Sequence, residues 1–294
     1  MEKMKNQTKK GLNAGNLKMI ALFCMVIDHI GVAILYPLAK NQESMLLLYF
    51  VFRLIGRVAF PIYAFFVTEG FFHTRNKLKY ALRLLLLAVI SEVPFDMVLD
   101  HKLFCTQYQN VFFTLLFGLL TIWAMDAIGK TKIKRGCSVV IKLLIITVVC
   151  FLTEFAIRGD YGAIGVFSIV SIYLTRKNEK VLTVIFFATA IIMSEVSNFA
   201  GFDEDFLFVT AISVACFFVM IYVLFLKNSH TKEMTVACVS LTALNSMEAF
   251  ALIDAFLVAK YNGEKGKINK WFFYFAYPCH LFLLALLCMA LKLY

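Results

Sequence analysis

The stretch that decides the fold runs from Arg53 to Asp96 and reads RLIGRVAFPIYAFFVTEGFFHTRNKLKYALRLLLLAVISEVPFD. It contains two apolar segments joined by a basic turn near Asn76, and each segment is long enough to cross a membrane of about 30 Å. Both segments carry charged residues at depth, where an unpaired charge costs roughly 2.5–3.5 kcal/mol on insertion scales. The stretch therefore predicts two antiparallel transmembrane helices whose charges are paired inside the protein.

Opposite charges in this stretch lie at similar distances from the turn. Arg57 lies nineteen residues before Asn76 and Asp96 lies twenty residues after it. Glu69 and Arg83 each lie seven residues from the same point. If the two helices pack as a hairpin, we expect the pairs Arg57–Asp96 and Glu69–Arg83 to form at two depths. Such pairing predicts a polar chamber within the bilayer.

The composition sets the class of protein. The chain has 294 residues, of which 61% are hydrophobic, and a mean hydropathy of +0.80, outside the range of soluble domains. The net charge of +10 comes mostly from Lys and Arg in short clusters between apolar runs, as in cytoplasmic loops. Because these residues do not form one patch, we expect no nucleic-acid partner. The sequence predicts an all-α, polytopic transmembrane bundle in the lipid bilayer.

We expect a basic cytoplasmic tail over residues 1–18 and a single transmembrane domain over residues 19–294, with about ten spans and a cytoplasmic N-terminus. The expected spans are 19–38, 46–72, 80–99, 110–128, 139–157, 161–174, 181–200, 207–226, 235–258 and 271–291. The acidic loop Gly201–Asp205 fits the outer side.

This count disagrees with the charge rule at one place. It puts Lys260, Lys265, Lys267 and Lys270 outside, although basic loops are normally cytoplasmic. Either that loop is an exception or one segment does not cross the membrane. The short segment Tyr161–Leu174 is the one we suspect.

Asp28 and His29 lie about ten residues into the first span, roughly 15 Å deep in a helix. Neighbouring residues of a helix point in different directions, so we expect His29 to face the chamber and Asp28 to bond Arg53 or Arg57. Histidine is suited to proton transfer near neutral pH. The alternative is a histidine that only packs helices together, but ionisable groups at this depth are usually functional.

Two further groups of charges have a structural alternative. Arg53 and Arg57 either hold an anion or simply pair with Glu92 and Asp96, and both interpretations stay open. At the turn, basic side chains suit a nucleotide phosphate, but membrane anchoring alone explains Lys77 and Lys79, and we favour that interpretation for these two. The turn candidates for donor binding are Glu69, His73, Arg75, Lys79 and Arg83. Weaker candidates elsewhere are Asn110, Thr114, Asp160, Tyr161, Tyr277 and His280.

Seven stretches give the chain a resemblance to the TraX family. They are LKMIALFCMVIDHIG, RLIGRVAFPIYAFFVTEGFFHTRN, RLLLLAVISEVPFD, NVFFTLLFGLL, GDYGAIGV, KYNGEKG and FFYFAYPCHL, in family order. The resemblance implies a polytopic inner-membrane protein, with N-terminal acetylation of a conjugative pilin as the founding activity and similarity to wider groups of acyltransferases that use cytoplasmic acetyl-CoA. The residues that match the family blocks are Asp28, His29, Arg53, Arg57, Pro61, Glu69, Gly70, His73, Arg75, Glu92, Pro94, Asp96, Tyr277, Pro278 and His280.

We therefore expect a membrane-embedded acetyltransferase of the cell membrane that uses acetyl-CoA as donor, with a protein or glycan as acceptor and no metal. His29 would act as general base and Arg53 or Arg57 would stabilise the oxyanion, held by Asp28, Glu92 and Asp96. Direct transfer and an acetyl-histidine intermediate both remain open. The alternatives are a proton-coupled transporter or permease and a non-catalytic membrane assembly factor.

Overall fold

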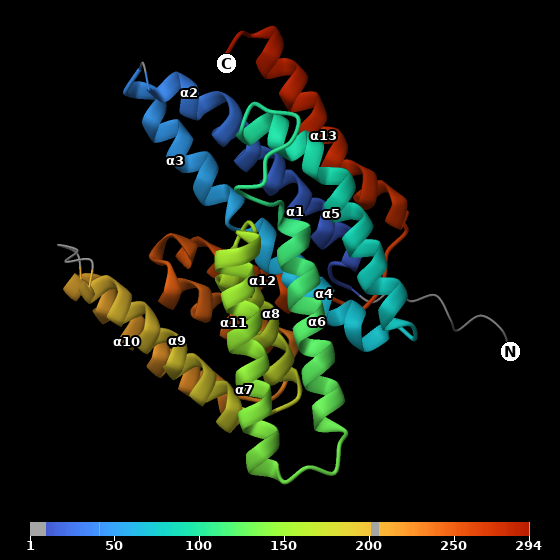
Figure 1. The fold of residues 1–294 in the computed structure, drawn as a ribbon, viewed down its shortest axis with the longest axis vertical. Helices are drawn as coiled ribbons and strands as arrows, with labels where there is room; N and C mark the ends of the chain where they lie inside the picture. Colours follow the sequence, from blue (N-terminus) through green and yellow to red (C-terminus); the bar gives the residue numbers. More distant parts are fainter. Residues whose placement is uncertain (1–9, 41, 201–205, 294) are drawn as a thin grey trace, which may run out of the picture.

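The computed structural model describes residues 10–40, 42–200 and 206–293, and it is helical throughout this part of the chain apart from loops and two isolated β-bridges. The first half contains α1 (Ala14–Ile30), the π-helix η1 (Gly31–Leu35), α2 (Tyr36–Ala39), α3 (Ser44–Gly56), α4 (Ala59–His73), α5 (Lys77–Leu99) and α6 (Val111–Gly129). The second half contains α7 (Arg135–Phe151), the π-helix η2 (Leu152–Ile157), α8 (Gly162–Arg176), α9 (Lys180–Ala200), α10 (Phe206–Leu224), α11 (His230–Leu244), the 3₁₀ helix η3 (Ser246–Leu252), α12 (Ile253–Ala259) and α13 (Lys270–Ala290). Figure 1 shows their arrangement.

Asn and Ser residues mark where several helices begin. The side-chain oxygens of Asn13, Asn76, Asn110, Ser229 and Asn269 each accept a backbone N–H of the following first turn, at 2.8 to 3.2 Å. Such caps satisfy donors that have no partner within the helix. The first cap places the start of α1 at Ala14, inside the expected tail, and residues 1–9 of that tail lie outside the described residues.

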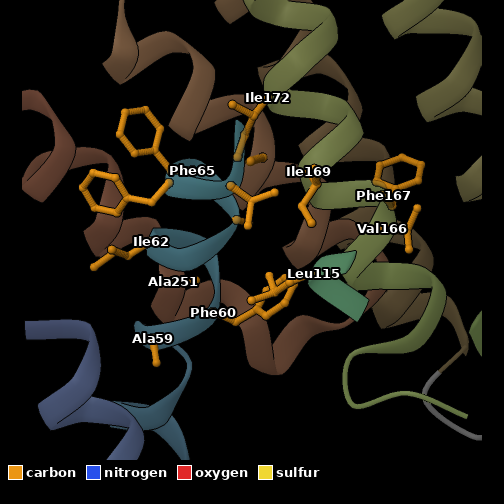
Figure 2. Close-up of a cluster of buried hydrophobic side chains, with 14 of the residues drawn as sticks. Ala59, Phe60, Ile62, Phe65, Leu115, Val166, Phe167, Ile169, Ile172 and Ala251 are labelled. Atoms are coloured by element: carbon orange, nitrogen blue, oxygen red, sulfur yellow. The ribbon is translucent and has the colours of Figure 1, made fainter. Parts of the chain in front are cut away.

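The core lies where α4 meets α8, with contributions from α6 and η3 (Figure 2). Phe60, Ile62 and Phe65 of α4 are buried, and Ile169 and Ile172 of α8 are fully buried opposite them. Almost all of α8 is buried, although it has only 15 residues. A helix that is apolar all round is expected to be surrounded by protein or lipid, and α8 is the central helix that other helices cover.

The outer helices present apolar side chains outward. On α5, Leu78, Leu82, Leu86 and Val89 are exposed at helical spacing, whereas the opposite face is buried. Within the described residues, five segments are long and apolar enough to cross a membrane: Ala14–Ala39, Ser44–His73, Val111–Gly129, Arg135–Ile157 and Lys270–Ala290. The helical class and the membrane character are as predicted, while the tally of about ten spans is not confirmed. The loop Gly201–Asp205 lies outside the described residues.

The second predicted span is broken near its middle. α3 ends at Gly56 and α4 begins at Ala59, so Arg57 lies in the break. Pro61 lies four residues after Arg57, and a proline has no N–H for the carbonyl four residues earlier and clashes with it. Pro61 therefore explains why the helix is interrupted at this charged residue. By contrast, α5 continues through Pro94 without a break.

Basic loops gather at one end of the bundle. The carboxylate of Asp126 forms ion pairs with Lys77, Lys130 and Lys177, at 2.7 to 3.1 Å, and these lysines come from the ends of three different helices. We call this the basic end. The chain near the N-terminus also lies here, because Leu12 donates its N–H to the carbonyl of Lys260 at 2.7 Å, and Tyr261 lines a cavity together with His73 and Arg176.

The expected span 235–258 is wrong. Its helix ends at Leu244, and the chain turns at Asn245 into η3 and then α12, which lies back against α11. Asn228 before α11 and Tyr261 after α12 line the same cavity. Both ends of the segment thus lie at the basic end, and we infer from this a re-entrant hairpin. On this inference Lys260, Lys265, Lys267 and Lys270 follow a segment that does not cross the membrane, which removes the conflict with the charge rule.

This topology predicts which positions are labelled from which side. In a background with Cys137→Ser and Cys279→Ser, a membrane-impermeant thiol reagent should modify Lys227→Cys, Lys265→Cys and Lys132→Cys from one face of oriented vesicles. It should modify Lys102→Cys from the other face. Labelling of Lys227→Cys and Lys265→Cys from opposite faces would contradict the re-entrant hairpin.

Candidate functional site

A pair of histidines lies in the interior between the first and last long helices. His29 Nδ1 of α1 is 2.7 Å from His280 Nε2 of α13, and the two ring planes are nearly parallel, at 15°. Tyr277, one turn before His280, presents its ring edge-on to His29 at a centroid distance of 6.0 Å. His29 is buried, at 8% exposed, whereas His280 is only partly buried. The predicted interior position of His29 is confirmed, whereas its pairing with His280 was not predicted.

Two small cavities meet at Tyr277, beside the histidine pair. The first, of about 40 Å³, is lined by Asp28, His29 and Tyr161 among others. The second, of about 130 Å³, is mostly apolar and reaches Lys18 near the start of α1. Met25, Tyr63, Val111 and Tyr277 line both cavities. His29 and Tyr277 therefore lie at the inner end of a narrow space that begins close to the basic end.

A buried ionic network lies beside the first cavity. Asp28 Oδ2 accepts a hydrogen bond from Arg53 Nη1 at 2.7 Å, and its other oxygen is 3.6 Å from Arg57 Nη2. Arg57 Nη1 also donates to Glu248 Oε1 of η3, at 2.7 Å. The predicted bond from Asp28 to Arg53 or Arg57 is confirmed. Glu248 was noticed only as a polar residue of the expected ninth span, because that span was taken to be continuous.

Gly56 allows α3 to approach α1 at this network. A Cβ atom at Gly56 would overlap the side chain of Asp28. On the other side, the ring of Tyr161 lies over the Arg57 guanidinium at 5.5 Å and stacks on Phe60 at 4.0 Å. Arginine on an aromatic face is a favourable contact where water is excluded.

Asp160, in the loop before α8, lines the first cavity and accepts a hydrogen bond from the Tyr108 hydroxyl at 2.8 Å. Burial raises the pKa of the Asp160 carboxyl, whereas the Tyr108 hydrogen bond and the two nearby arginines act in the opposite direction. The loops 100–110 and 158–161 are joined by backbone hydrogen bonds at this end of the bundle. Asp160 and Tyr161 thus close the site on the side away from the basic end.

The pair Arg57–Asp96, which was expected from equal depth in the bilayer, is wrong. Arg57 binds Asp28 and Glu248, not Asp96. Asp96 accepts from the Cys105 backbone N–H at 2.6 Å, and Glu92 accepts from Asn110. The reason is that α5 packs along α6 and α13 instead of along α4 (Figure 1). Glu92, Asp96 and Asn110 therefore hold the loop between α5 and α6 and do not position the arginines.

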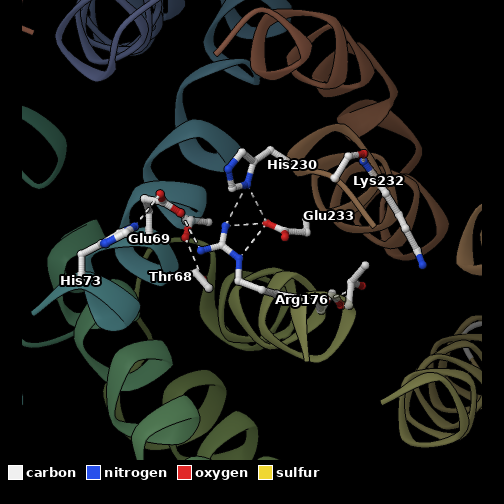
Figure 3. A network of polar contacts seen from close by, with 11 residues as sticks. Thr68, Glu69, His73, Arg176, His230, Lys232 and Glu233 are labelled. Carbon is white, nitrogen blue, oxygen red and sulfur yellow. Dashed lines mark hydrogen bonds and ion pairs between the residues drawn. The ribbon is translucent and has the colours of Figure 1, made fainter. Parts of the chain in front are cut away.

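The expected pair Glu69–Arg83 is also wrong. Glu69 forms an ion pair with Arg176, at 2.5 Å, and a hydrogen bond with His73, at 3.1 Å, and Arg176 also binds Glu233 (Figure 3). These side chains, with His230, line a cavity of about 720 Å³ at the basic end. Arg83 instead lies over the ring of Tyr80 at 5.7 Å, which places it near the mouth of the second cavity.

The five proposed donor-binding residues therefore lie in three different places. Glu69 and His73 line the large cavity, whereas Lys79 and Arg83 are exposed on α5 near Tyr80. Arg75 is exposed in the turn between α4 and α5. Arg176 and Glu233 were missed, because Arg176 resembled an ordinary basic residue after a span and Glu233 lay next to a predicted loop.

These features define a polytopic helical membrane protein with an interior histidine pair and a buried Arg–carboxylate network. The family model described as TraX protein matches residues 14–233. The chain belongs to the TraX family. The matched residues include Asp28, His29, Arg53 and Arg57, whereas Glu248 and the last helix with His280 lie beyond them.

A curated relative supports the same membership. The chain is 31% identical over 176 residues to a protein of Dichelobacter nodosus named "Probable fimbrial assembly protein FimC, serogroup H1". The alignment covers 58% of this chain and 66% of that protein, just under two thirds of its length. No solved structure matches the chain.

The buried network predicts a large stability loss when one partner is removed. Arg57→Leu leaves the buried carboxylate of Glu248 without a cation, while Asp28 keeps Arg53, and breaking such a buried pair costs about 3–5 kcal/mol. We expect a clearly lower thermal unfolding midpoint in detergent. The double variant Arg57→Leu/Glu248→Leu should recover part of the loss, because one uncompensated charge is removed with its partner.

Arg75→Leu is the matched control, since Arg75 is exposed, and it should leave the midpoint nearly unchanged. Equal midpoints for Arg57→Leu and Arg75→Leu would refute a structural role for the network.

Proposed function

We propose that this chain is a membrane-embedded acetyltransferase that transfers acetyl from cytoplasmic acetyl-CoA to an amine or hydroxyl of a protein or glycan acceptor. One observation carries the proposal most directly. His29 and Tyr277 lie at the inner end of a narrow space that begins near the basic end. Membership of the TraX family, for which the sequence resemblance implies pilin acetylation, agrees with this chemistry.

The orientation follows from the charges. Because basic loops face the cytoplasm, we place the basic end, with Lys77, Lys130 and Lys177, on the cytoplasmic side of the cell membrane. The N-terminus is then cytoplasmic. The loops 100–110 and 158–161 lie on the outer side.

The donor enters through the second cavity. Its walls are mainly apolar and aromatic, including Phe66, Leu84 and Phe273, which suits the slender pantetheine arm of acetyl-CoA. Lys18 lines its outer part, and Arg83 lies over Tyr80 in the same wall. We assign the CoA phosphates to these two cations and to the exposed Lys79. The thioester then reaches the position where the two cavities meet.

The chemistry requires a base and an oxyanion donor. The acceptor attacks the thioester carbonyl carbon while His29 Nε2 takes its proton. As the C–S bond breaks, the same proton passes to the departing CoA sulfur. Among the described residues the buried Tyr277 hydroxyl donates to no acceptor, so its proton is available to the oxyanion.

The arginines have a different role from the one expected. Arg53 and Arg57 already bind carboxylates, so their charges are largely committed to Asp28 and Glu248. We assign them to holding α1, α3 and η3 around the cavity, and we assign the oxyanion to Tyr277.

Substitution of His29 tests its role as the general base. His29→Ala and His29→Gln should insert and fold like the parent chain but lose acetyl transfer, by about 10²-fold or more, because general base catalysis is removed. The assay measures transfer of labelled acetyl from acetyl-CoA in proteoliposomes that contain the protein. Membranes from cells that lack this protein are added to supply the acceptors. Retained turnover in both variants would remove His29 from the mechanism.

Two other measurements distinguish the alternative functions. A proton-coupled transporter would move a solute without consuming acetyl-CoA. A non-catalytic assembly factor, a role that the relative's name favours, would leave surface proteins and glycans with unchanged acetylation when the gene is deleted.

A second prediction separates donor binding from chemistry. Lys18→Glu should raise KM for acetyl-CoA and leave kcat nearly unchanged, because the phosphates are bound equally in ground and transition states. Tyr277→Phe should lower kcat by about 10²–10³-fold with a similar KM, as for loss of one oxyanion donor. The reverse pattern would overturn the assignment of the second cavity to the donor.

A further inference from the structure

We infer that His280 is a positioning residue that fixes His29 in the tautomer whose Nε2 carries the free lone pair. The inference rests on the proposed function for its chemical meaning, but its structural part can be tested without turnover. It begins from a chain of three groups: the backbone carbonyl of Ala276, the ring of His280 and the ring of His29.

The direction of each hydrogen bond follows from the carbonyl. His280 Nδ1 lies 2.8 Å from the Ala276 oxygen, and a carbonyl oxygen only accepts, so Nδ1 must carry the proton. A neutral imidazole has one N–H, so His280 Nε2 is an acceptor. His29 Nδ1, 2.7 Å away, must then be the donor. The remaining nitrogen of His29, Nε2, is left with its lone pair.

The surroundings of His29 agree with this assignment. Within the described part of the chain, His29 Nε2 has no hydrogen-bond partner, and His29 lines the smaller cavity beside Asp28 and Tyr161. The lone pair is therefore the only hydrogen-bonding capacity that His29 offers to a substrate. A base with the opposite tautomer would present an N–H there and would not accept a proton.

The contact also acts during the reaction. When His29 takes the acceptor proton at Nε2, it becomes an imidazolium whose Nδ1–H still points at the His280 lone pair. A hydrogen bond to a charged donor is stronger than one between neutral groups, so the contact stabilises the charged form. This is the role that a carboxylate has behind the histidine of a Ser–His–Asp triad, here supplied by a neutral ring on another helix.

The chain is suited to a direct test of the tautomer. It contains five histidines, so ¹⁵N-histidine labelling of the full protein in lipid nanodiscs gives few signals, and His29→Gln and His280→Gln assign two of them by subtraction. We expect a protonated Nδ1 and an unprotonated Nε2 for both residues, with a coupling across the His29 Nδ1···His280 Nε2 bond. Protonation of His29 at Nε2, or absence of that coupling, would overturn the inference.

Acetyl-transfer activity provides a second test of the inference. His280→Gln retains an amide oxygen that can accept from His29 Nδ1 and should keep much of kcat. His280→Leu removes the acceptor and should lower kcat on the order of 10²-fold with an unchanged KM for acetyl-CoA. Cys279→Ser, on the exposed face of α13, is the control and should behave like the parent chain.

If His280→Leu and His280→Gln lose activity equally, or neither loses it, a tautomer role for His280 is excluded. Absence of acetyl transfer by the parent chain would instead refute the proposed function, and the nanodisc spectra would still decide the tautomer.

Discussion

The contact between Arg57 and the carboxylates of Asp28 and Glu248 connects three parts of the chain that are far apart in sequence. Pro61 interrupts the second span at this residue, and the break leaves the guanidinium inside the protein. Burying an unpaired arginine there would cost free energy, and one carboxylate alone would leave part of the guanidinium without an acceptor. Glu248 at the tip of the re-entrant hairpin provides the second carboxylate. The hairpin is thus fixed to α1 through a buried charge.

The shape of the site follows from that fixed contact. With the hairpin held on one side and α13 on the other, α1 presents Asp28 toward the arginines and His29 toward His280. Adjacent residues of one helix thereby serve two different neighbours, as their angular separation requires. The two cavities meet beside this helix and share the walls formed by Tyr63 and Tyr277. A polar centre therefore lies beside a mainly apolar passage, and in the proposed reaction such a passage would keep water away from the thioester.

Some of this architecture could be predicted from the sequence, and the reasons are specific. Hydropathy and loop charge were sufficient for an all-helical membrane protein, and the depth of Asp28 and Arg53 was sufficient for their pairing. The pairs Arg57–Asp96 and Glu69–Arg83 failed because equal depth says nothing about which face a helix turns to its neighbour. The sequence also gave no sign that α5 would leave α4 and pack along α6 and α13. The misplaced lysines near residue 260 did indicate a segment that does not cross, although α8 was suspected in place of α11 and α12.

The central claim is that the donor reaches His29 through the narrow space between Lys18 and Tyr277, and not through the larger cavity at Glu69 and Arg176. A structure of the full chain in nanodiscs with a non-hydrolysable thioether analogue of acetyl-CoA tests it directly. The account predicts density for the pantetheine arm between Tyr63 and Tyr80, with the acetyl analogue beside His29 Nε2. Density for the analogue in the cavity lined by Arg176 and Glu233, with the space beside His29 empty, would contradict it.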